Sequence, residues 1–213
     1  GDEINLVNQS FSIAFWAKRD PASGIDLTMI QGTSDDDNKV LYLGFYSDGT
    51  FMFDFQNNEL TTPEAYGDYD WHHWTCTYDA TDNTRIIYRD GVAVAQDTAS
   101  ADYQGTGKFI IGRSFNGSMD DIYVYPRPIS EVEIQALMQN AWQIVAALRD
   151  YHEDQGRFPP AYTTDRNGKR MHSWRVLILP HLDEQGLYDR FRLNEPWNSP
   201  HNFHLLSEIP DVF

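Results

Sequence analysis

Alternation of apolar and polar residues, interrupted by short turn sequences, dominates the first 128 residues of the chain. It is clearest in the segments 11–19, 40–55 and 84–97. Asp48-Gly49 and Asp90-Gly91 divide the last two segments. An Asp-Gly pair between apolar runs favours the tight turn of a β-hairpin, because glycine accepts a positive φ. A period of two places successive side chains on opposite faces of a strand, so these segments predict paired strands.

Three further segments, 71–79, 108–114 and 119–125, have the same strand character, and no helical periodicity separates them. About ten short strands without a helix predict two antiparallel sheets packed face to face. We therefore expect a mainly β domain over residues 1–128, a connecting helix over 129–156 and a small α+β region over 157–213.

A series of sequence words occurs in a fixed order in the predicted sandwich: FSIAFWAKRD, SDGTFMF, WHHWTCTYD, IIYRDGVAVA, FIIGRS and GSMDDIYVYPRPIS. Over about residues 3–138 this series resembles the laminin-G-like/pentraxin-like domains of the concanavalin A-type lectin and glucanase superfamily. The resemblance implies an antiparallel jelly-roll β-sandwich that binds carbohydrate or protein and often carries Ca²⁺.

Acidic residues at two places in this domain are candidate Ca²⁺ ligands, because hard cations prefer carboxylate oxygens. Asp35 and Asp37 lie in the loop 34–39, and Asp120 and Asp121 begin the segment 119–125. The loop is not an EF-hand, because Val40 stands where that motif requires glycine. The alternatives are a solvated acidic loop and, for Asp120 and Asp121, a structural role in which alternation sends one side chain inward and the other to solvent.

The histidine pair in WHHW has the composition of a metal or catalytic site, but its spacing argues against one. His72 and His73 are adjacent on a predicted strand, so their side chains point to opposite faces. His72 shares a face with Trp74, Cys76 and Tyr78, which we expect to be the core face. The pattern therefore favours a hydrogen-bonded core histidine at position 72 over a metal ligand.

The net charge of the chain and the spacing of its carboxylates argue against several classes of function. The chain has 32 acidic and 16 basic residues, for a formal net charge of −16. This charge argues against nucleic acid, whose phosphates require Lys and Arg, and against an anionic membrane surface. A retaining glycosidase needs two carboxylates about 5 Å apart. Residues 1–128 contain only Glu3, Glu59 and Glu64, none of which lies in the alternating acidic run of the superfamily's enzymes.

The segment 129–156 predicts a helix. Ser130 and Glu133 have the spacing of a capping box, apolar residues follow at helical intervals, and Gly156 supplies a stop. The apolar positions at helical spacing are Ile134, Leu137, Met138, Ala141, Ile144, Val145, Leu148 and Tyr151. A second option is that Ile134 and Leu137 pack on the sandwich, while the stripe Trp142, Val145 and Leu148 packs on the C-terminal region. Because no Ser/Gly linker is present, the helix is predicted to couple the two parts rigidly, although a break near Gln139-Asn140 is an alternative.

The C-terminal words GRFPPAY, HSWRVLILPHL and LYDRFRLNEPWNSPHN resemble a pilin-like bacterial domain of unknown function, some members of which are labelled solute-binding proteins, over about residues 140–213. In that family an apolar prepilin-type helix leads into the FPPA word, whereas this chain has the sandwich in its place. We expect a turn at Asn167-Gly168 and a helix over 173–191, capped by Ser173 and kinked or divided by Pro180. A buried strand is the alternative for the apolar run 176–179.

The loop EPWNSPHN is predicted to be a structural clasp in which Trp197 seals the edge of a small core, since Pro196 and Pro200 both forbid helix before them. The alternative is a zinc site made by His201 and His204 with His181 or His172.

Together these features favour a non-catalytic recognition or adhesion module that binds a glycan or an envelope protein, possesses no nucleic-acid surface and does not itself insert into a membrane. We expect an extracytoplasmic location, with a signal or anchor removed before Gly1. The alternatives are a glycan hydrolase and a purely structural envelope component.

Overall fold

The computed structural model describes residues 4–21, 24–32, 36–210 and 212–213. The chain divides into two compact units, unit 1 (Gly1–Gln135) and unit 2 (Ala136–Phe213), and the boundary falls within the long helix α1 (Glu131–Gln155). None of the helices in the described ranges is long and apolar enough to cross a membrane. The predicted rigid coupling of the two parts stays a prediction.

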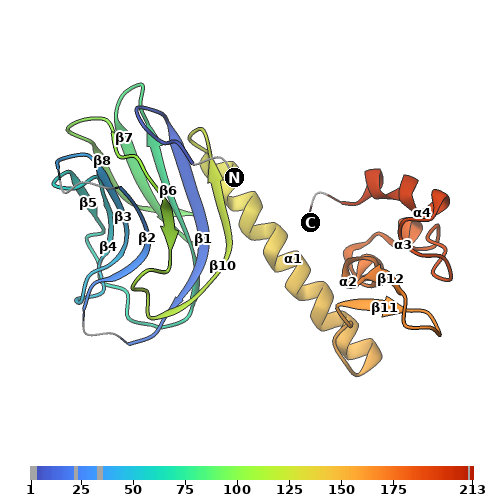
Figure 1. Ribbon diagram of the computed structural model, residues 1–213. Helices are drawn as coiled ribbons and strands as arrows, with labels where there is room; N and C mark the ends of the chain where they lie inside the picture. Colours follow the sequence, from blue (N-terminus) through green and yellow to red (C-terminus); the bar gives the residue numbers. More distant parts are fainter. Residues whose placement is uncertain (1–3, 22–23, 33–35, 211) are drawn as a thin grey trace. The chain divides into compact units, whose positions relative to one another are not determined.

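Unit 1 consists of two five-stranded antiparallel sheets packed face to face, which confirms the predicted sandwich (Figure 1). One sheet has the order β10-β1-β6-β7-β8 and the other the order β5-β4-β3-β2-β9. The strands are β1 (Phe11–Arg19), β2 (Asp26–Gly32), β3 (Val40–Phe45), β4 (Phe51–Asp54), β5 (Glu59–Thr61), β6 (Trp71–Asp79), β7 (Thr84–Arg89), β8 (Val92–Thr98), β9 (Phe109–Ile111) and β10 (Gly117–Tyr125).

The Asp-Gly turns form as the sequence predicts. Arg89 pairs with Val92, so Asp90 and Gly91 make a two-residue turn between β7 and β8, with φ of 51° and 76°. Positive φ at both central residues is the geometry of a type I′ hairpin. Gly49, with φ of 92°, turns the chain between β3 and β4. Local turn chemistry therefore sets the register of these strand pairs.

The core lies between the two sheets and is rich in aromatic side chains. Trp74 and Phe51 come from opposite sheets and stack with ring centroids 4.3 Å apart. Trp74, Cys76 and Tyr78 are at most 2% exposed, which confirms the predicted core face of β6. Burial of these side chains contributes to the hydrophobic free energy of the sandwich.

The segment that leads into α1 is bound to the outer face of the β1-containing sheet at Ser12. The Ser12 hydroxyl donates to the carbonyl of Arg127 at 3.0 Å and accepts from the N–H of Ile129 at 2.9 Å. Ile134 is fully buried, as predicted. His73, on the outer face of β6, is only 2% exposed, and its ring packs against that of Trp16 with ring centroids 5.4 Å apart.

Helix α1 begins with the predicted capping box. Glu133 accepts from the backbone N–H of Ser130 at 2.8 Å, and the Ser130 hydroxyl accepts from the N–H of Glu133 at 3.3 Å. Hydrogen bonds from Arg127 and then from Ser130 lower the pKa of Glu133 to about 2. Gly156, with φ of 68°, ends the helix and donates to the carbonyl of His152 at 2.8 Å. The helix runs through Gln139-Asn140 without a break.

Unit 2 contains a two-stranded sheet followed by short helical segments. The turn at Asn167-Gly168 joins its two strands, and Gly168 has φ of 80°, as predicted. The elements are β11 (Tyr162–Thr164), β12 (Arg170–Ser173), α2 (Trp174–Leu177), η1 (Leu179–Leu182), α3 (Gln185–Tyr188), α4 (Pro200–Leu205) and η2 (Leu206–Glu208). The predicted helix over 173–191 is thus divided at Pro180, and Ser173 precedes α2 without making a side-chain cap bond.

The core of unit 2 consists of Val176, Leu179, Leu187, Phe191 and Leu205. Ala147 of α1 is fully buried, and the ring of Tyr151 lies 5.8 Å from that of His181. Trp142 and Val145 are 61% and 54% exposed, so their predicted packing on the C-terminal region is wrong. The reason is angular: the buried face of this half of α1 contains Ala147 and Tyr151, at i and i+4, and Trp142 and Val145 lie on another side.

Candidate functional site

One end of the sandwich combines exposed aromatic side chains with a network of charged groups. The segment 66–72 leads there into β6 and meets the turn between β7 and β8. We call this surface the Tyr69 rim, and define it by Tyr66, Asp68, Tyr69, Asp70, Trp71, His72, Arg89 and Asp90.

His72 is the centre of the charged network. Its Nδ1 lies 2.6 Å from Oδ2 of Asp90, and its Nε2 lies 2.7 Å from the guanidinium of Arg89 and 3.2 Å from Asp68. In the neutral ring Nδ1 donates to Asp90 and Nε2 accepts from Arg89, whereas the protonated ring donates to Asp68 instead. Asp90 also accepts from the backbone N–H of His73 at 3.0 Å. The network thus joins β6 to the hairpin turn in either protonation state.

Arg89 is held between this network and the aromatic core. Its guanidinium carbon lies 4.4 Å from the ring centroid of Tyr66 and forms an ion pair with Asp68. Burial acts to raise the pKa of Asp68, but the charges of His72 and Arg89 outweigh it and lower the pKa below its ordinary value. Asp68 is therefore an ionised acceptor, half-exposed and fixed in position.

Tyr69 has an unusual backbone conformation. Its φ is 56°, in the left-handed region that bulky residues rarely adopt, and its side chain is 41% exposed. Trp71, two residues later, is 43% exposed. Backbone strain of this kind is concentrated at functional sites, where the surrounding structure holds it in place. The conformation presents an aromatic ring to solvent beside two carboxylates, Asp68 and Asp70.

A small hollow of about 20 Å³ opens at the rim, lined in part by Arg19, Tyr69 and His72. It is too small for a sugar ring, so a ligand of that size would lie on the surface. Exposed aromatic rings offer an apolar face for the C–H side of a sugar, and fixed charged groups accept or donate strong hydrogen bonds to hydroxyls. The rim has both kinds of group.

His72 is hydrogen-bonded, as predicted, but it is not a core residue. Its side chain is 20% exposed, because β6 begins only one residue earlier and position 72 lies at the edge of the sandwich. Alternation placed His72 on the correct face but did not show where the facing sheet ends. Arg89 and Asp90 were missed as its partners, although their position at the end of a predicted hairpin was a signal that they are close to β6.

The candidate calcium ligands have different settings. Asp35 lies outside the described residues. Asp37 accepts from the side chain of Asn57 at 2.8 Å. Asp120 and Asp121 are both exposed, which corrects the expected inward and outward alternation: β10 is irregular opposite β1 at this point, and Asp121 has φ of 47°.

Over the ranges that the structure describes, no three His, Cys, Asp or Glu side chains are grouped so that they could hold a metal ion. Calcium binding therefore stays a prediction. The histidines of the alternative zinc site are also not grouped together within the described residues. His172 lies 2.8 Å from the carbonyl of Glu195, and His201 lies 2.9 Å from the carbonyl of Arg190, so both rings bind backbone.

Asn202, not Trp197, is the clasp of the loop EPWNSPHN. Trp197 is 48% exposed and does not seal the core. Asn202 is fully buried; its side-chain oxygen accepts from the N–H of Arg192 at 2.9 Å, and its amide donates to the carbonyls of Arg192, Glu195 and Pro196. The predicted clasp is present, but a buried amide and not the tryptophan closes the loop.

Two antiparallel sheets around an aromatic core, with an open rim in place of a deep cleft, define a lectin-like jelly-roll fold. Residues 2–135 match the family model described as the concanavalin A-like lectin/glucanases superfamily, and the chain belongs to that superfamily. Residues 138–209 match a second family, described as a protein of unknown function (DUF1559). Both predicted resemblances are thereby confirmed at the level of the family, and no curated protein matches the chain.

Solved structures with the same fold include carbohydrate-binding modules. The Ruminococcus gnavus IT-sialidase CBM40 has a TM-score of 0.51 and 15% identity, over 62% of this chain and 84% of that one. Its structure bound to α2,3-sialyllactose gives the same values. A heptameric SAP-like pentraxin from Limulus polyphemus has a TM-score of 0.45 and 14% identity, over 62% of this chain and 70% of that one. At these identities the likeness shows the fold alone.

Proposed function

We propose that unit 1 is a non-catalytic recognition module that binds a carbohydrate at the Tyr69 rim. The observation that carries the proposal is Tyr69 itself, an exposed aromatic side chain held in a left-handed backbone conformation next to Asp68 and the His72 network. Its ring would stack on a sugar, and Asp68 and Asp70 would accept hydrogen bonds from sugar hydroxyls. Because Asp68 is already held by His72 and Arg89, it loses little conformational entropy on association.

The charge of the rim favours a neutral glycan. Residues 1–128 have 20 acidic and 8 basic side chains, and Asp68, Asp70 and Asp90 all lie at the rim. Arg89 is paired with Asp68, so its charge is largely compensated. The CBM40 relative was solved with an acidic sugar, α2,3-sialyllactose. An anionic sugar would be repelled by the carboxylates of this rim, so we assign it a different specificity.

The proposal includes an extracytoplasmic location, where glycans are displayed, and a role for unit 2 in an envelope assembly. A protein ligand at the same rim is a second reading, since exposed aromatic residues also favour protein interfaces. Glycan hydrolysis is the remaining alternative. Relatives of the same fold are carbohydrate-binding modules, which supports a binding function over a catalytic one.

A glycan array probed with the full chain tests the proposal. We expect binding to neutral oligosaccharides and weaker or absent binding to their sialylated forms. Absence of binding across the array would favour a structural component, and release of shorter products from a bound polysaccharide would favour a hydrolase. Melting curves with and without EDTA test the calcium prediction separately: metal bound only to the folded state raises the melting temperature, so an unchanged curve would remove it.

A further inference from the structure

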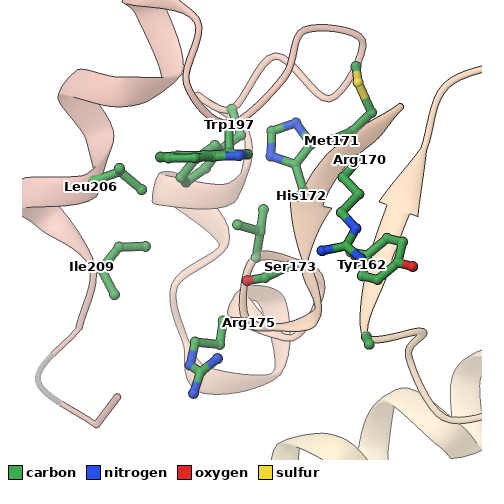
Figure 2. A pocket seen from close by; sticks show the side chains of 12 residues that line it. Tyr162, Arg170, Met171, His172, Ser173, Arg175, Trp197, Leu206 and Ile209 are labelled. Carbon is green, nitrogen blue, oxygen red and sulfur yellow. The ribbon is translucent and has the colours of Figure 1, made fainter. Parts of the chain in front are cut away.

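A pocket of about 420 Å³ opens in unit 2, within the part that matches the family of unknown function. It lies between the β11–β12 sheet, α2 and the segments that carry Trp197 and Leu206 to Ile209 (Figure 2). Val176, Trp197, Leu206 and Ile209 give it mainly apolar walls. A cavity of this size and character is typical of small-molecule sites.

His172 lines this pocket and carries a buried atom without a partner. The side chain is only 1% exposed, and its Nε2 lies 2.8 Å from the carbonyl of Glu195. A carbonyl accepts only, so Nε2 must carry the proton, and in the neutral ring Nδ1 is an acceptor. Nδ1 is buried and has no hydrogen-bond partner among the described residues. A buried acceptor without a donor costs free energy, which a ligand that supplies an O–H or N–H would recover.

Two arginines at the pocket supply positive charge. The guanidinium carbon of Arg170 lies 4.3 Å from the ring centroid of Tyr162, and that of Arg175 lies 4.6 Å from the ring centroid of Trp174. Both residues line the pocket and both are exposed. Neither forms an ion pair with a carboxylate within the described ranges, although the chain has a net charge of −16. Their charges are therefore available to an anionic ligand group.

We propose that this pocket binds a small hydroxy acid with an apolar body. The body packs against Val176, Trp197 and Ile209, a hydroxyl donates to Nδ1 of His172, and a carboxylate pairs with Arg170 or Arg175. The donor is a hydroxyl and not an ammonium group, because the two arginines repel a second cation. The apolar walls select an aromatic or branched aliphatic body over a sugar, so the site differs in ligand class from the Tyr69 rim.

Binding of 3-(4-hydroxyphenyl)propanoate to the full chain tests the two polar contacts, because two related compounds each lack one of them. The analogue 3-phenylpropanoate has no hydroxyl, and 4-ethylphenol has no carboxylate. Titration followed by tryptophan fluorescence and by histidine side-chain ¹⁵N NMR should show saturable binding of the hydroxy acid and a shift of the His172 Nδ1 signal. We expect about fivefold weaker binding of each analogue, the usual worth of one hydrogen bond or exposed ion pair.

Variants of the protein show which residues account for the two losses of affinity, one on removing the hydroxyl and one on removing the carboxylate. His172→Gln keeps a donor for the Glu195 carbonyl but lacks the Nδ1 acceptor, so it should bind the hydroxy acid and 3-phenylpropanoate equally. Arg175→Gln together with Arg170→Gln should bind the hydroxy acid and 4-ethylphenol equally. Arg166→Gln, an exposed arginine that does not line the pocket, is the matched control and should bind as the wild type does.

The proposal is overturned if 3-(4-hydroxyphenyl)propanoate shows no saturable binding to the wild-type chain. It is also overturned if the double arginine variant, whose exposed positions leave the fold intact, retains the wild-type preference for the hydroxy acid over 4-ethylphenol. The double arginine variant tests the proposal even if His172→Gln destabilises unit 2.

Discussion

The imidazole Nδ1 of His72 lies 2.6 Å from Oδ2 of Asp90. This hydrogen bond joins the start of β6 to the hairpin turn between β7 and β8. The same aspartate adopts the positive φ of the type I′ turn. One residue therefore serves both the turn and the rim. This double use explains how a short hairpin turn fixes the orientation of the segment that carries Tyr69.

Replacing Asp90 with Asn separates these two uses. Asn also accepts the positive φ of the turn, so the hairpin should form. The charged acceptor for His72 is lost, and we expect the free energy of unfolding to fall by about 1 kcal/mol, because the pair is partly exposed. Urea denaturation measures the change. Asp82→Asn is the matched control, since Asp82 is an exposed turn residue whose carboxylate accepts from the N–H of Thr84. An equal effect of both variants would contradict the role of the network.

The buried His73 should make stability depend on pH. Burial lowers its pKa to about 4 from an ordinary value of 6.5, and the charge of Asp90 only partly offsets this. As the pH falls, the unfolded chain therefore binds a proton at His73 before the folded chain does. The free energy of unfolding is highest above pH 6.5 and decreases as the pH falls toward 4. Between pH 7 and 5 the loss should be about 2 kcal/mol.

Melting curves at these pH values test the prediction. His73→Gln stays neutral, so its stability should change little between pH 7 and 5, whatever its value at pH 7. His204→Gln, at an exposed position, should keep the wild-type dependence. The same steep loss in His73→Gln would show that another group is responsible.

The capping box of α1 should contribute measurably to unit 1. Ser130→Ala removes the hydroxyl that accepts from the N–H of Glu133, and loss of such a cap costs about 1 kcal/mol. Ser114→Ala, an exposed serine, serves as the control. Because the pKa of Glu133 is lowered to about 2 from 4.5, the contribution of its carboxylate to the free energy of unfolding should be present above pH 4.5 and disappear as the pH falls through 2. Glu133→Gln should remove this acid-dependent part, and an unaltered acid transition would contradict it.

Asn202 should be the most sensitive residue of the EPWNSPHN loop. Asn202→Ala leaves a buried N–H and several carbonyls without a partner, and we expect unit 2 to lose about 3 kcal/mol. Asn198→Ala, at an exposed position of the same loop, should change stability by less than about 0.5 kcal/mol. Hydrogen exchange of the Arg192 N–H reports the loss directly. Equal protection in the two variants would mean that the loop is closed by other contacts.

Local sequence signals predicted the fold well, because each depends on a few neighbouring residues. Asp90-Gly91 and Asn167-Gly168 specify turns, and Ser130 with Glu133 specifies the start of α1. Alternation likewise placed Trp74 in the core. These features need no knowledge of the facing sheet.

The candidate site could be predicted only in part, because it depends on where separate segments end in space. His72 lies on the predicted face but beyond the edge of the core. The positive φ of Tyr69 has no local signal, since the residue is not glycine or asparagine. The closely spaced Tyr69 and Trp71, flanked by aspartates, were the only indication of an exposed aromatic rim.

The affinity of a neutral oligosaccharide for three variants tests the central claim most directly. Tyr69→Ala and Trp71→Ala each remove an exposed ring of the rim, whereas Tyr123→Ala removes a ring that is 47% exposed on β10. By isothermal titration calorimetry we expect the rim variants to lose about tenfold or more in affinity, in line with loss of an aromatic contact, and Tyr123→Ala to bind as the wild type does. Undiminished binding by Tyr69→Ala and Trp71→Ala, with their melting temperatures unchanged, would contradict the account.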